Sequence, residues 1–240
     1  MALIMGSAPT IYPNNGVLME IIVKDIHKRY GKKEVLKGLT FSAHSGQCIG
    51  ILGENGCGKS TLLSVLAGVR NGDKGEFLYD GKDLFQYPRQ RRELVAYVPQ
   101  GTPLMEELTA KDNLLLWYDK KTMNRELEQG VLRTLGICDF LNVRVSKMSG
   151  GMKKRLSIAC AVAGHPPILL LDEPMSALDL SCKKEIFHYI SKIKEMGGIV
   201  IMVTHDVLEM RLCDICYTLR DGRLFPGAPE DFADALVKLV

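Results

Sequence analysis

The hydrophobic pattern of this chain is a series of short apolar runs separated by turns. Each run has the length of a buried strand and is far shorter than the roughly 20 residues that cross a bilayer. The runs lie at residues 20–23, 40–42, 47–52, 76–79, 94–98, 168–171 and 199–203. We expect strands there, with a hairpin turn at Asp80-Gly81.

Apolar residues at helical spacing fill the middle of the chain. Between about residues 102 and 163 they form groups such as Leu127, Val131, Leu132 and Leu135. Further helices are expected at 59–68, at 180–196 and after Asp206. In the second half of the chain, strands and helices alternate, which indicates crossover units and a parallel sheet. The pattern predicts an α/β core with a helical insert.

Composition narrows the possible classes of protein. The 240 residues are 46% hydrophobic, enough for one domain or one domain with an insert, and a net charge of +3 is too small to indicate a nucleic-acid partner. Residues 1–18 lack the pattern of a secretory signal and are interpreted as a flexible tail or a cloning remnant, with Met19 as an alternative start.

The cysteines favour a reducing compartment. Seven cysteines, an odd number at irregular spacing, do not predict a disulfide framework. Cys213 and Cys216 form a CxxC without the second pair that a metal site would need. We interpret them as two thiols near a strand edge, and we expect a cytosolic chain.

A glycine-rich loop follows the run at 47–52 and precedes an expected helix. It fits the pattern GxxxxGK[ST] in the strand-to-helix context that the pattern requires. Glycines let backbone N–H groups curl around phosphate oxygens, and the helix N-terminus favours an anion. Lys59 is expected to reach the β- and γ-phosphates of ATP, and the Ser60 hydroxyl to bind Mg²⁺. The expected ATP contacts are Gly53, Asn55, Gly56, Cys57, Gly58, Lys59, Ser60 and Thr61.

Two acids end the run at 168–171. The carboxyl edge of a parallel sheet is where phosphates bind in open α/β folds, so Asp172 and Glu173 are expected beside the loop. Asp172 suits a ligand of Mg²⁺, and Glu173 suits a general base that polarises the attacking water. Two acids at a solvated strand end are the plainer alternative, which the phosphate-binding loop makes less attractive.

Further motifs make the chain resemble the ATP-binding cassette (ABC) family of ATPases. That family carries a signature, most often LSGGQ, and this chain has Met148-Ser149-Gly150-Gly151-Met152. Residues 174–179 resemble the D-loop of the family, Gln100 its Q-loop and His205 its switch histidine, while Tyr30 matches the aromatic that stacks on adenine. The resemblance covers about residues 19–224.

The resemblance implies a P-loop NTPase core with a mostly parallel sheet and helices, an antiparallel β subdomain and an α-helical insert. Residues 19–240 would form a single nucleotide-binding domain with the helical subdomain at about 102–163. An ATPase is implied, with catalytic residues Glu173, His205, Gln100 and Lys59, and with Mg²⁺ ligands Ser60, Gln100 and Asp172. Ser149, Gly150 and Gly151 would contact the γ-phosphate held by a second subunit, so ATP would drive dimerisation.

The resemblance also implies the setting of the protein. The helical insert of this family docks on an integral membrane subunit, so the chain is expected to power transport from the cytoplasmic, inner face of the cell membrane, without nucleic acid. Met152, followed by three basic residues, resembles exporters of drugs, antibiotic peptides and sodium. Import, the transported substrate and pairing with itself or a paralogue stay open.

Two other classes of function compete with a transporter ATPase. Some relatives act on ribosomes or DNA, but those carry two cassettes or long coiled coils, and this chain has one cassette and no sustained heptads. A small-molecule kinase would need an acceptor site and would not need residues 149–151 or His205. The remaining histidines, including His165, are interpreted as structural.

Overall fold

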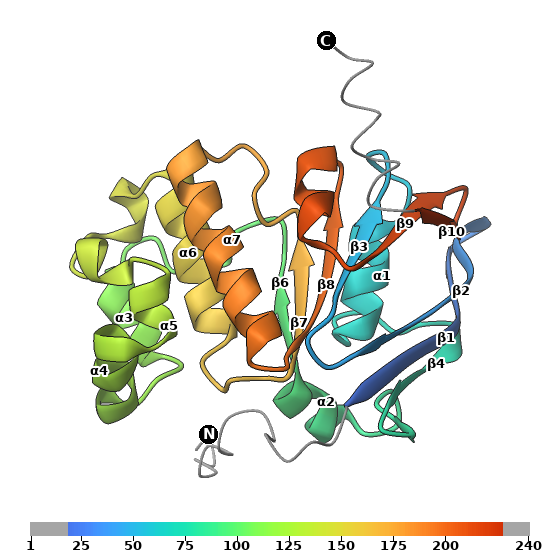
Figure 1. Cartoon of the computed structure of the whole chain (residues 1–240), viewed down its shortest axis with the longest axis horizontal. Helices are drawn as coiled ribbons and strands as arrows, with labels where there is room; N and C mark the ends of the chain where they lie inside the picture. The colour runs from blue at the N-terminus through green and yellow to red at the C-terminus, as the bar shows by residue number, and fades with distance from the viewer. Residues whose placement is uncertain (1–18, 228–240) are drawn as a thin grey trace.

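Two β-sheets and a group of helices make up residues 19–227, the part of the chain that the computed structural model describes (Figure 1). The tail expected at residues 1–18 and the end of the expected domain, residues 228–240, lie outside the described residues. Among residues 19–227, no helix combines the length and the hydrophobicity that crossing a membrane requires.

The smaller sheet is antiparallel and has the strand order β2-β1-β4-β5. Its strands β1 and β2 form one long hairpin, where the apolar pattern predicts only short strands, because their outer face carries polar side chains that interrupt the pattern. The turn between β4 and β5 has positive φ at both Asp80 and Gly81, as the hairpin sequence predicts. The strands are β1 (Glu20–Tyr30), β2 (Lys33–His44), β4 (Lys74–Tyr79) and β5 (Lys82–Asp83).

The larger sheet has the order β10-β9-β3-β8-β7-β6, and every pair in it is parallel except β9 with β10. All side chains of β7 and β8 are buried, which explains their uninterrupted apolar sequences. The strands are β3 (Cys48–Leu52), β6 (Val95–Val98), β7 (Ile168–Asp172), β8 (Ile199–Thr204), β9 (Ile215–Arg220) and β10 (Arg223–Gly227).

The helix expected after Asp206 is present as a short 3₁₀ helix, η3 (Val207–Leu212). β9 begins only three residues later and leaves no room for a longer helix. Cys216 lies in β9, an interior strand between β3 and β10, and not at the strand edge expected for it. Cys213 precedes β9 and is buried, with its Sγ 3.6 Å from the Cys48 Sγ of β3.

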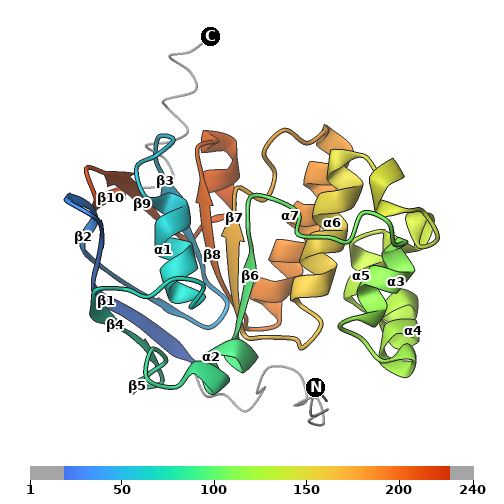
Figure 2. The same ribbon diagram turned by 180° about the vertical axis from the view of Figure 1, so that it is seen from behind.

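Helices cover the larger sheet and extend beyond it. One group stands beyond the β6 end of the sheet in both views (Figures 1 and 2). It contains α3 (Ala110–Leu115), α4 (Lys120–Gln129), α5 (Val131–Thr134), the short 3₁₀ helices η1 (Ile137–Phe140) and η2 (Val145–Lys147), and α6 (Gly150–Ala161). The others are α1 (Lys59–Leu66), α2 (Pro88–Leu94) and α7 (Leu180–Glu195).

The larger sheet is the middle layer between two hydrophobic cores. Leu169 and Leu171 of β7 pack into a core shared with α3, α6 and α7, and Ile168 and Leu170 pack into a core shared with α1 and the antiparallel sheet. Successive strand residues point to opposite faces, so one strand supports both cores. This packing fixes the strand ends on which the candidate site is built.

Candidate functional site

The carboxyl ends of four neighbouring strands meet at one edge of the larger sheet. β3 leads into the glycine-rich loop, β6 is followed by Gln100, β7 ends at Asp172, and His205 follows β8. These strands are parallel, so the segments that follow them lie at the same edge, as ligand sites in open α/β sheets do. The expected convergence of Gln100, Asp172 and His205 on the loop is therefore present.

The glycine-rich loop, residues 53–58, curls around the ammonium group of Lys59. The Lys59 Nζ donates hydrogen bonds to the carbonyl oxygens of Gly53 (2.6 Å) and Glu54 (3.2 Å). Gly58 precedes α1 with a φ of 116°, a backbone conformation that residues with a side chain rarely adopt. No side chain caps the start of α1, so the N–H groups of its first turn are available to an anion.

The Glu173 carboxylate is the centre of the site. Its Oε2 accepts a hydrogen bond from Gln100 Nε2 at 3.2 Å, and its Oε1 lies 3.1 Å from His205 Nδ1 and 3.5 Å from Lys59 Nζ. The side chain is 6% exposed. Glu173 has a φ of 46°, an unfavourable backbone conformation for a residue with a side chain. Three motifs thus hold one buried carboxylate.

The Asp172 carboxylate is buried beside Ser60. Tyr97 donates its hydroxyl to Asp172 Oδ2 at 3.3 Å, and Oδ1 is buried without a hydrogen-bond partner. Burial raises the pKa of Asp172, and the nearby hydroxyls of Ser60 and Tyr97 partly oppose that rise. A buried carboxylate oxygen next to a hydroxyl is a donor set that suits a hard cation.

An open cleft of about 690 Å³ lies beside α1. Its lining includes Ser60, Thr61 and Tyr97, together with Tyr30, which is 40% exposed. The Arg70 guanidinium lies 5.6 Å from the centre of the Tyr30 ring. The cleft therefore joins the loop to an aromatic ring that a base could stack on.

The signature residues stand apart from the loop of the same chain. Ser149 caps α6, its Oγ accepting from the Met152 N–H at 3.3 Å, and Ser149 and Gly150 are exposed. Gly151 packs against α7, where an added methyl group would collide with Cys182. In both views α6 and α1 lie on opposite sides of β6 and β7 (Figures 1 and 2). Residues 149–151 are the sequence-predicted site residues that the fold does not bring to the loop.

Two buried charged residues next to this edge were not predicted as site residues. Burial lowers the pKa of Lys154 to about 8 and raises the pKa of Glu209 to about 7. Lys154 belongs to a basic run whose sequence suggests a solvated surface, and Glu209 lies in the segment after Asp206 that was expected only to be a helix. Their burial depends on tertiary packing, so the sequence carries no signal for it.

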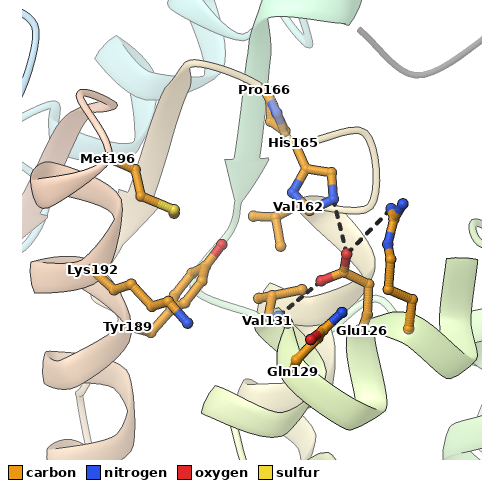
Figure 3. A pocket seen from close by; sticks show the side chains of 11 residues that line it. Glu126, Gln129, Val131, Val162, His165, Pro166, Tyr189, Lys192 and Met196 are labelled. Carbon is orange, nitrogen blue, oxygen red and sulfur yellow. Dashed lines mark hydrogen bonds and ion pairs between the residues drawn. The ribbon is translucent and has the colours of Figure 1, made fainter. Parts of the chain in front are cut away.

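A second cavity, of about 250 Å³, lies where α4 and α5 meet the ends of α6 and α7 (Figure 3). Its buried carboxylate, Glu126, accepts a hydrogen bond from the Val131 N–H at 2.9 Å and lies 3.3 Å from His165 Nε2. The Lys192 ammonium donates to Thr134 Oγ1. These polar groups pair with one another, so we interpret the cavity as part of the packing contact between helices and not as a ligand site.

Comparison with known proteins supports this picture. Residues 36–176 match the family model described as ABC transporter. The chain is 35% identical over 219 residues to the Nod factor export ATP-binding protein I of Rhizobium etli, covering 89% of this chain and 69% of that protein. It is 33% identical over 216 residues to the spermidine/putrescine import ATP-binding protein PotA of Mycoplasma mycoides subsp. mycoides SC, covering 87% and 61%.

Solved structures show the same fold. One described as the ATP binding subunit of an ABC transporter superposes with a TM-score of 0.78 at 28% identity, covering 90% of this chain and 93% of that one. The cbiO1 protein of Clostridium perfringens, described as part of the ABC transporter complex cbiONQ, gives 0.77 at 27% identity, covering 90% and 92%.

The fold and the phosphate-binding edge define an α/β ATPase of the P-loop class, which confirms the predicted fold class. The chain belongs to the ABC transporter family. It is an ATP-binding, ATP-hydrolysing subunit of such a transporter, as the resemblance in its motifs predicts.

Proposed function

We propose that this subunit hydrolyses ATP at the edge formed by β3, β6, β7 and β8, with Glu173 as the general base. The convergence of Gln100, His205 and Lys59 on one buried carboxylate carries this proposal. In the proposed mechanism, Glu173 polarises the attacking water, and His205 contacts the γ-phosphate. Gln100 orients the water, and Lys59 neutralises charge on the β- and γ-phosphates.

We further propose that Mg²⁺ is held by Ser60, Asp172 and Gln100. The partnerless buried Oδ1 of Asp172 fits a cation or one of its water ligands. Bound Mg²⁺ would neutralise charge on the phosphate oxygens during hydrolysis. The adenine would stack on Tyr30 at the cleft, and the phosphates would bind the backbone and side chains of Gly53, Asn55, Gly56, Cys57, Gly58, Lys59, Ser60 and Thr61.

A second cassette completes the site in this proposal. The exposed helix start at Ser149, Gly150 and Gly151 offers a hydroxyl and free N–H groups to an anion, and it lies away from the loop of its own chain. It would contact the γ-phosphate bound by a second copy or a paralogue. ATP would then close the dimer, and hydrolysis would reopen it. We propose residues 19–240 as the unit that dimerises.

The membrane partner and the direction of transport are also proposals. Relatives of this chain are named for Nod factor export and for spermidine/putrescine import, so both directions occur among similar proteins. We propose that a separate integral membrane subunit docks on the helical group, which places the ATPase on the cytoplasmic face of the membrane. Met152 in the signature favours export.

A Glu173→Gln variant tests the assignment of the base. General-base catalysis contributes about 100-fold or more, so turnover should fall by at least that factor while ATP still binds and dimers accumulate. Turnover would be measured as phosphate release, binding by equilibrium titration, and dimers by size-exclusion chromatography with ATP. Glu195→Gln, at an exposed acid at the end of α7, is the control and should keep wild-type turnover. Undiminished turnover of Glu173→Gln would overturn the assignment.

A further inference from the structure

The Lys154 side chain joins the signature helix to the catalytic edge of the same chain. Lys154 lies one turn into α6 and is 4% exposed. Its Nζ donates to the carbonyl oxygens of Pro99 (2.8 Å), Gln100 (3.3 Å) and Asp172 (3.4 Å). The first two carbonyls follow β6 and the third ends β7, so one ammonium group holds two strand ends against one helix.

The surroundings of Lys154 do not resemble those of an ordinary stabilising ion pair. Its three N–H donors go to main-chain carbonyls, while the carboxylates of Asp172, Glu173 and Glu209 act on it only through their charge. Burying an ammonium group is costly, and an apolar residue of similar volume often stabilises a core as well. A role in geometry explains the buried lysine better than a role in stability.

Two of the Lys154 hydrogen bonds go to segments that hold Glu173 in place. The carbonyl of Gln100 is fixed by Lys154, and the Gln100 side chain donates to Glu173 Oε2. The carbonyl of Asp172 belongs to the peptide bond that joins Asp172 to Glu173. We infer that Lys154 is a positioning residue, which keeps Gln100 and the Glu173 carboxylate in register with the signature helix.

This inference rests on the proposed roles of Glu173 and Gln100, and it adds a link between them and α6. A shift of α6 relative to the sheet would strain the three hydrogen bonds of Lys154. It would thereby move Gln100 and the Asp172–Glu173 peptide bond, which hold the Glu173 carboxylate. The signature residues at the start of the same helix would thereby act on the base of their own chain, besides their proposed contact with a second cassette.

Replacing Lys154 by Met tests the inference in the full chain. Met keeps the volume and apolar stem but removes all three donors, so kcat should fall at least tenfold while the Kd for ATP stays within twofold. The control is Lys153→Met at the adjacent residue, whose ammonium pairs with Glu106 at the surface, and its kcat should stay within twofold of wild type. Lys154→Arg, which retains several donors, should recover part of the lost kcat.

A double-mutant cycle with Gln100→Ala distinguishes positioning from general stability. If Lys154 acts through Gln100, the double variant should lose much less activity than the product of the two single losses. The inference is overturned by multiplicative losses, by a loss of ATP affinity equal to the loss of kcat, or by equal effects of Lys153→Met and Lys154→Met.

Replacement variants of Lys154 and a parallel measurement of Glu173→Gln complete the test. If Lys154→Met does not fold, the comparison of Lys154→Arg with the shorter Lys154→Gln replaces it, with kcat expected in the order wild type, Arg, Gln and with unchanged ATP affinity. Equal kcat among the three would overturn the inference. Glu173→Gln is measured alongside: an active Glu173→Gln refutes the proposed base, whereas an inactive Glu173→Gln with a fully active Lys154→Met refutes only the role of Lys154.

Discussion

Cys57 lies inside the glycine-rich loop that we propose binds the phosphates, so the reactivity of its thiol should depend on what occupies that loop. The thiol is partly buried, and burial raises its pKa, so little thiolate is present at neutral pH. Alkylation by a maleimide should therefore be slow at neutral pH and should accelerate as the pH rises beyond the ordinary range of a cysteine. Bound ATP should slow the reaction at every pH because it covers the loop.

The measurement needs one other thiol removed. Cys138 is exposed, whereas Cys48, Cys160, Cys182, Cys213 and Cys216 are buried, so a Cys138→Ser background isolates Cys57 among the described residues. Mass spectrometry would follow the labelled peptide with and without ATP. Labelling of Cys57 at one rate in both conditions would contradict its proposed place in the ATP site.

The sequence predicts some residues at this edge of the larger sheet and not others. Gln100, Asp172 and His205 could be placed from sequence because each follows an apolar strand of a parallel sheet, and such strands end together. Lys154 could not, because a lysine in a basic run is usually solvated, and only the packing of α6 against β6 buries it.

Whole strands and helices also differ in how well the sequence predicts them. β7 and β8 were predictable because helices and the second sheet bury both of their faces, which demands continuous apolar sequence. β9, β10 and α2 were not predicted. β10 has no fully buried residue and neither has α2, so neither carries a periodic apolar pattern, while β9 is buried at only two positions.

The contact between α4, α5 and the end of α6 depends on the buried Glu126 carboxylate (Figure 3). The hydrogen bond with His165 is the main cause that lowers the pKa of Glu126, and the Val131 N–H and Arg125 lower it further. The Glu126 charge also adds to the rise that burial causes in the pKa of Tyr118. Because the folded-state pKa lies below the unfolded value of about 4.3, the carboxylate stabilises the fold above that value. This contribution is lost as the pH falls through the folded-state pKa.

Replacing Glu126 by Gln should lower the free energy of unfolding by roughly 1–3 kcal/mol at neutral pH, the usual worth of hydrogen bonds to a charged group. The difference from wild type should persist down to about pH 5 and shrink in more acidic solution. Urea unfolding at a series of pH values measures it. Glu128→Gln, at an exposed acid of the same helix, is the control and should change stability little. A difference that grows as the pH falls would contradict the assignment.

At the scale of the whole molecule, α1, which follows the glycine-rich loop, and α6, which begins at the signature, lie on opposite sides of β6 and β7 (Figure 1). In the proposed dimer, the loop and the signature are therefore halves of two different ATP sites. Two variants can inactivate one half each. Glu173→Gln removes the base, and Ser149→Asp keeps the helix cap of α6 but places a negative charge where the γ-phosphate of a partner would bind. Each variant alone should be nearly inactive, since every site in its own dimer contains one damaged half.

Mixing the two variants should restore activity. In a mixed dimer, the intact loop of the Ser149→Asp chain faces the intact signature of the Glu173→Gln chain and forms one working site. An equimolar mixture should reach up to roughly a quarter of wild-type turnover, because half of its dimers are mixed and each holds one intact site. Ser149→Asn, which caps the helix without a charge, controls for the loss of the hydroxyl. A mixture no more active than its components would show that identical copies do not share ATP sites, and it would leave pairing with a paralogue as the alternative.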